Sequence, residues 1–152
     1  MRFNIGMSAV RIIFQTDGYG GLIARLFLGA VMLPHGFQKI FTVEQTMNSF
    51  TSKMDLPYVV AVLVIAGESV GAVSLIIGFM SRFCALSMGI IMIGAVHMFH
   101  LRHGFFMNWK KDLDAGQGYE YHLLMIGLAL VVVVCGGGKL SVDRVIGRMS
   151  SS

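Results

Sequence analysis

The chain has 152 residues, of which 55% are hydrophobic and 13% are charged, and its mean hydropathy is +0.73. A soluble domain of this size is excluded, because small domains bury too little of their surface to hide so many apolar residues. The net charge of +4 does not indicate nucleic acid, since the basic residues lie in short loops and at segment ends rather than in one patch.

The N-terminal segment 1–20 is predicted to lie in the membrane interface. Its apolar run, residues 3–14, is too short to span a bilayer and contains Asn4 and Arg11. This mixture is typical of an amphipathic interfacial segment. No cleavable signal peptide is evident in it.

Four apolar stretches follow, and a helix needs about 20 such residues to cross a bilayer. They cover residues 21–41, 58–79, 82–101 and 121–135, the last being the shortest. The short turn Met80-Ser81 makes the second and third helices antiparallel neighbours. The sequence therefore predicts an all-α fold, an integral membrane four-helix transmembrane bundle over residues 21–140. Residues 141–152 are then a cytoplasmic tail.

The orientation follows from the even number of spans, which puts both termini on one side of the membrane. That side carries Arg2, Arg11, Arg144 and Arg148, and the opposite side carries a similar number of basic residues beside several acids. Short loops rich in Lys and Arg favour the cytoplasm, and acids contribute little to this rule. We expect both termini in the cytoplasm.

Two ionisable residues lie deep in the first two spans. Glu68 is near the midplane, and Arg25 is about a turn and a half from the midplane on the terminal side. A mid-span carboxylate must be paired or protonated. We therefore predict a structural ion pair between Arg25 and Glu68.

A polar cluster is expected at the end of the bundle opposite the termini. Residues three or four apart share a helix face, and the first, third and fourth spans all place polar groups at this depth. One shared pocket satisfies several such groups at once, with the glycine-containing turns 104–108 and 118–120 lying over it. The predicted ligand-binding residues are His35, Gln38, Lys39, His97, His103, Asn108 and Glu120.

Two other interpretations of these residues stay open. In the first, the polar side chains fan outward to the headgroups as separate groups, and Lys39, His100 and His122 are the best candidates for this. In the second, His97 and His100 hold a metal, because they have a plausible ligand spacing. No carboxylate accompanies them at recognisable spacing, so we predict no metal site.

Four sequence motifs resemble those of the DoxX family. They are RL at 25–26 with LPHGFQKIF at 33–41, ESVG at 68–71 leading to GFMSR at 78–82, HGFFMN at 103–108, and GYEY at 118–121. The resemblance implies a small bacterial inner-membrane protein of four helices. It also implies a link to redox functions, including quinone chemistry and oxidative-stress complexes.

The leading hypothesis is a membrane redox component that handles a quinone or a related small electron carrier, as a subunit of an oxidoreductase complex. The sequence has no flavin or nicotinamide fingerprint, so a redox protein partner would supply the electrons. No catalytic residue is assigned, and whether the chain is an enzyme stays open. The alternatives are a non-catalytic accessory membrane subunit and a small-molecule transporter, which would need a homo-oligomer to provide enough helices.

Overall fold

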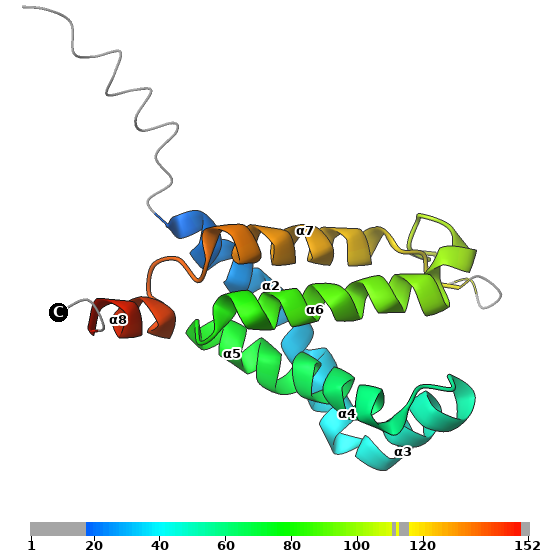
Figure 1. Ribbon diagram of the computed structural model, residues 1–152. Helices are drawn as coiled ribbons and strands as arrows, with labels where there is room; N and C mark the ends of the chain where they lie inside the picture. The colour runs from blue at the N-terminus through cyan, green and yellow to red at the C-terminus, as the bar shows by residue number, and fades with distance from the viewer. Residues whose placement is uncertain (1–17, 111, 113–115, 150–152) are drawn as a thin grey trace, which may run out of the picture.

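The computed structural model describes residues 18–110, 112 and 116–149, so the predicted interfacial segment 1–20 falls almost wholly outside the described residues. The described part is built of helices joined by turns and contains no strand. The first long helix is α2, Tyr19–Phe41, and it is followed by the short α3, Val43–Asn48, and the π-helical η1, Ser49–Lys53. Figure 1 shows α3 and η1 at one end of the bundle and α8 at the other.

The second and third predicted spans each form one long helical rod, and each rod contains a π-helical turn. The second consists of α4 (Tyr58–Ala66), η2 (Gly67–Gly71) and α5 (Ala72–Ile77). The third consists of α6 (Ser81–Ala95), η3 (Val96–His100) and the 3₁₀ turn η4 (Leu101–His103). Gly78 and Met80 adopt positive φ angles of 75° and 48° in the tight turn between the rods. The two rods are antiparallel, as predicted (Figure 1).

The last span is α7, Glu120–Cys135, which is followed by a glycine-rich turn and by α8, Val142–Met149. Three helical rods in the described residues are long and apolar enough to cross a membrane, Tyr19–Phe41, Tyr58–Ile77 and Ser81–His103, and α7 is a shorter apolar helix. The outward faces are apolar, with Phe27, Leu63 and Leu124 each more than 60% exposed. A bundle with this surface is soluble in lipid rather than water, so the predicted helical membrane bundle is confirmed.

The core of the bundle is apolar, and glycines set how closely its helices approach. Leu28, Leu75, Met88 and Val132 are fully buried in it. A Cβ at Gly29 would lie 2.9 Å from the carbonyl oxygen of Ala72, and one at Gly36 would collide with the backbone of Glu68. These two glycines therefore bring α2 against α5 and η2, as small residues do in membrane helix contacts.

The terminal end of the bundle is held by a buried guanidinium. Arg25 is 1% exposed and donates hydrogen bonds to the carbonyls of Leu75 (2.9 Å), Gly137 (2.7 Å) and Leu140 (2.7 Å), with further bonds to Ile76 and Lys139. Two of these carbonyls, those of Leu75 and Ile76, belong to the last turn of α5, where helix carbonyls lose their regular partners, and that of Leu75 also accepts the N–H of Gly78 (3.2 Å). The predicted Arg25–Glu68 pair is thus wrong, because Arg25 bonds to backbone carbonyls instead.

The C-terminal helix is fixed to the same end. The carboxylate of Asp143 accepts hydrogen bonds from the backbone N–H groups of Met80 (2.7 Å) and Ser81 (2.8 Å) at the start of α6. A carboxylate at a helix N-terminus satisfies its unpaired donors. The first turn of α8 is therefore docked on the bundle.

Candidate functional site

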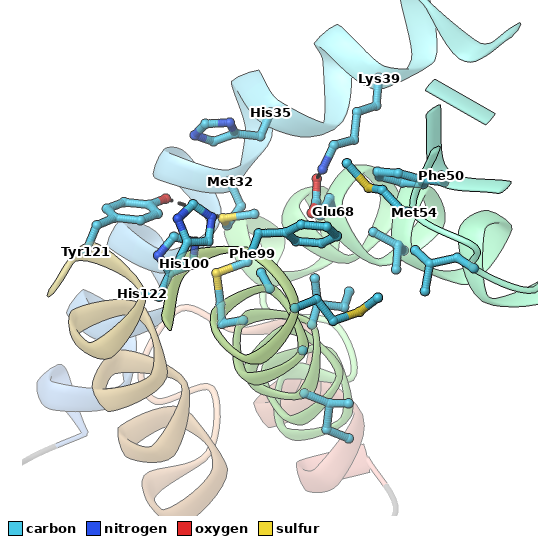
Figure 2. Close-up of a pocket in the computed structure, with 18 of the residues that line it drawn as sticks. Met32, His35, Lys39, Phe50, Met54, Glu68, Phe99, His100, Tyr121 and His122 are labelled. Atoms are coloured by element: carbon cyan, nitrogen blue, oxygen red, sulfur yellow. Dashed lines mark hydrogen bonds and ion pairs between the residues drawn. The ribbon is translucent and has the colours of Figure 1, made fainter. Parts of the chain in front are cut away.

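A cavity of about 590 Å³ opens at the end of the bundle that carries α3 and η1, between α2, α4, α6 and α7. Figure 2 shows its wall, in which methionine and phenylalanine side chains surround a few polar groups. Most of its surface is apolar, and its size is that of a small-molecule site. The polar residues on its wall are His35, Lys39, Glu68, His100, Gln117, Tyr121 and His122.

An ion pair stands at one side of this cavity. The ammonium group of Lys39 contacts the carboxylate of Glu68, whose side chain is 5% exposed against 25% for Lys39. Lys39 lies one turn beyond Gly36, so the close approach of α2 to η2 at Gly36 brings its side chain level with Glu68. Glu68 is therefore paired within the span, but with Lys39 and not with Arg25.

Glu68 lies on a π-helical turn, which has a local cause. The hydroxyl of Ser69 donates a hydrogen bond of 2.6 Å to the carbonyl of Ile65, one turn earlier. Such back-bonding competes with the helix ladder and loosens it. Two more π-helical turns border the cavity, since η1 contributes Phe50 and η3 contributes His100. π-helical turns within helices are frequent at functional sites.

Aromatic and imidazole rings gather on the other side of the cavity. The rings of His100 and His122 have centroids 4.0 Å apart, and those of His35 and Tyr121 are 6.4 Å apart. Figure 2 shows these four residues together, to the left of Lys39 and Glu68 in the view, with His35 one turn before Lys39 on α2. Nδ1 of His122 is buried, and no hydrogen bond to it is formed by any described residue. This side offers several ring nitrogens and a phenol, which can donate or accept hydrogen bonds and carry protons.

The loop before α7 folds back onto the bundle and forms part of the cavity wall at this end. The N–H of Glu120 donates to the carbonyl of Phe105 (2.9 Å), and the carboxylate of Glu120 accepts from the N–H of Met107 (3.0 Å). Gly118 lies so close to Phe106 that any side chain there would collide with its carbonyl. The turns 104–108 and 118–120 are thus joined to each other. They put Met107 and Gln117 on the cavity wall.

The seven predicted ligand-binding residues do not lie together. His35 and Lys39 line the cavity, whereas Gln38 faces a separate shallow groove beside α3. The structure places the other four, His97, His103, Asn108 and Glu120, away from the cavity wall.

Local contacts explain these four placements. His97 is exposed on the outer face of η3, and the ring of His103 packs beside Gly116. Asn108 hydrogen-bonds the backbone of Asp112 within the loop. Glu120 braces the loop, as described above. The expectation of one cavity formed by all seven side chains is therefore wrong.

His100, Tyr121, His122 and Glu68 line the cavity although sequence analysis did not assign them to it. His100 and His122 were considered as groups reaching outward to the headgroups, yet His122 is only 8% exposed. The available signal was helical spacing, because His100 lies eight residues after the core residue Met92. In the described residues, no group of three or more His, Cys, Asp or Glu side chains is arranged to hold a metal ion.

The fold and the cavity together define a small helical membrane protein with a mostly apolar cavity inside its bundle. The DoxX family profile matches residues 20–101, so the chain belongs to the DoxX family. This match covers α2 to the end of η3 and stops before Tyr121 and His122.

A Bacillus subtilis (strain 168) protein named "Putative oxidoreductase CatD" is 27% identical over 124 residues, which cover 82% of this chain and 84% of that protein. No solved structure matches the chain.

Proposed function

We propose that this protein is a membrane redox component that binds a quinone, or a related small electron carrier, in the cavity beside His35, His100 and Tyr121. The observation that carries the proposal is a mostly apolar cavity of about 590 Å³ with imidazole and phenol groups on one wall. A quinone has the same two-part chemistry, an apolar ring and two carbonyl oxygens that accept hydrogen bonds. The similarity to a protein named as an oxidoreductase supports a redox role.

The redox step balances with two electrons and two protons. A quinone that takes up both becomes a hydroquinone, each carbonyl oxygen becoming a hydroxyl. The protons pass from protonated ring nitrogens or the phenol on the cavity wall, which are refilled from water at the open end. The electrons come from a partner redox protein, and that partner is part of the proposal.

The location and orientation complete the proposal. We place the protein in the bacterial inner membrane with both termini in the cytoplasm. The cavity then opens toward the outer side of that membrane, where α3, η1 and the loop before α7 lie. A partner redox protein would meet the bundle at that end.

Co-purification tests the proposal. The protein is isolated in mild detergent, and its organic extract is analysed for quinones by mass spectrometry. We expect a quinone in near-stoichiometric amount with the wild type and with His97→Ala, and much less with His100→Ala. His97 is the matched control, because it lies on the same π-helical turn but outside the cavity. Equal amounts in all three preparations, or none, would contradict the proposal.

A further inference from the structure

The cavity has two chemically different parts. Its polar groups come from α2, η2, η3, α7 and the loop before α7. The part between α4 and α6 is lined only by apolar residues, which we call the α4–α6 slot: Val60, Val64, Ile90, Ile91 and Gly94. A ligand that fills both parts must itself have a polar end and an apolar end.

The slot exists because α4 and α6 diverge. The α6 helix packs against η2 and α5, while its contact with α4 is slight. Figure 1 shows α5 beside the start of α6 near the tight turn, and α4 further from α6 toward the other end of the bundle. A Cβ built on Gly94 would meet nothing within 4 Å. Space therefore remains between the helices at this level.

The slot is open to the surroundings at the depth of the bilayer. Val60 and Ile90 line the cavity and are nevertheless 39% and 61% exposed. Gly94 lies nine residues before the end of its span at His103, which is about 14 Å along the helix. The hydrocarbon layer is about 30 Å thick, so this opening faces lipid chains rather than water.

We infer that the ligand carries a long hydrocarbon tail, which lies in the α4–α6 slot and leaves the protein sideways into the bilayer. This inference rests on the proposed function, because the ring at the polar end is taken to be the quinone. It narrows the substrate class to tailed, lipid-soluble quinones that enter from the membrane. The tail gains apolar contacts with both helices, and the ring reaches His35, His100 and Tyr121 without crossing water.

The test compares two probes with the same ring. The tailless probe is 2,3-dimethoxy-5-methyl-1,4-benzoquinone, and the tailed probe carries a decyl chain in addition. Dissociation constants are measured by equilibrium dialysis with the protein in lipid nanodiscs, and empty nanodiscs correct for partition into lipid. The measured quantity is the ratio of the two constants.

Four proteins are compared. In the wild type we expect the tailed probe to bind severalfold more tightly than the tailless probe at equal concentration in the lipid, because the tail gains packing contacts with both helices of the slot. Gly94→Leu and Val64→Phe fill the slot from its two sides and should bring the ratio close to one. Gly127→Leu is the matched control, because Gly127 is exposed on α7 and a Cβ there also meets nothing within 4 Å. It should keep the wild-type ratio.

The outcomes separate this inference from the proposed function. If both probes bind the wild type equally after correction, or if both slot variants keep the wild-type ratio, the tail is not in the slot and the inference is overturned. Equal binding is also the result expected if a phospholipid chain occupies the slot. If neither probe binds the wild type, the proposed function fails, and this inference fails with it.

Discussion

Lys39 pairs with Glu68 across the contact between α2 and η2, at the level where the cavity begins. The pair depends on Gly36, whose lack of a side chain lets α2 lie against the backbone of Glu68. One glycine contact thus fixes which cation neutralises the carboxylate in the middle of the second span.

Breaking the pair from the lysine side should destabilise the protein. Lys39→Met leaves the carboxylate of Glu68 buried without a cation. We expect a loss of about 2–3 kcal/mol in SDS unfolding, less than for a fully buried pair because Lys39 is partly exposed. Lys53→Met, at an exposed lysine in η1, is the control and should change little. Adding Glu68→Gln to Lys39→Met should restore part of the lost stability. If Lys39→Met and Lys53→Met lower the stability equally, this account is wrong.

The contact at Gly36 should tolerate no side chain. Gly36→Ala forces α2 away from η2, and we expect it to cost about 1–3 kcal/mol, as overpacking does. Gly20→Ala lies in the same helix with open space around it and should be neutral or slightly stabilising. Thermal unfolding of both variants in the same detergent measures the difference. A Gly36→Ala protein as stable as the Gly20→Ala protein would show that α2 and η2 are not in close contact.

Arg25 should be irreplaceable even by lysine. Its planar guanidinium donates to carbonyls from α5 and from the turn after α7, and a single ammonium group cannot reach all of them. Arg25→Lys should therefore cost about 2–4 kcal/mol, because buried carbonyls lose their donors. Arg82→Lys provides the comparison, since Arg82 is exposed and makes one long bond of 3.3 Å to Val134. If the two substitutions cost the same in SDS unfolding, the buried network is not the source of stability.

Glu120 should stabilise the loop before α7 and contribute little to the stability of the bundle. Glu120→Ala removes the acceptor of the Met107 N–H group, and hydrogen exchange at that amide should become faster by about an order of magnitude or less, the worth of one hydrogen bond. Glu120→Gln keeps an oxygen acceptor and should exchange more like the wild type. The midpoint of thermal unfolding should change little in either variant. Unchanged exchange at Met107 in the alanine variant would contradict this role.

The bundle itself could be predicted from the sequence, because span length and apolar composition determine it. The helix starts differ little from expectation, with α7 beginning at Glu120 rather than at residue 121. The side chains that contact each other across the bundle could not be predicted this way. Depth along the helix axis suggested Arg25 as the partner of Glu68. The rotation and offset of α2 are instead set by its contacts at Gly29 and Gly36. The spacing of seven residues between these glycines was the signal in the sequence that this face of α2 packs against the second span.

The sequence predicted the location of the candidate site, at the end of the bundle opposite the termini, but not most of the residues that form it. His122 was expected near the headgroups because it starts the fourth span. The loop before α7 instead folds back through Gly118 and Glu120 and buries the first turn of that helix. His97 and His100 are three residues apart, yet one is exposed on the outer face and the other lines the cavity. This difference between the two histidines depends on the π-helical turn η3, which changes which side chains of the helix face the cavity.

The binding of a quinone ring by wild type, His100→Ala and His97→Ala proteins tests the central claim most directly. The dissociation constant of 2,3-dimethoxy-5-methyl-1,4-benzoquinone is measured for each in nanodiscs of the same lipid. We predict that His100→Ala weakens binding by about tenfold, the worth of one hydrogen bond to a ring carbonyl, and that His97→Ala changes it less than about twofold. Equal affinity of all three proteins for the ring, or a larger loss in His97→Ala than in His100→Ala, would contradict the assignment of this cavity as the quinone site.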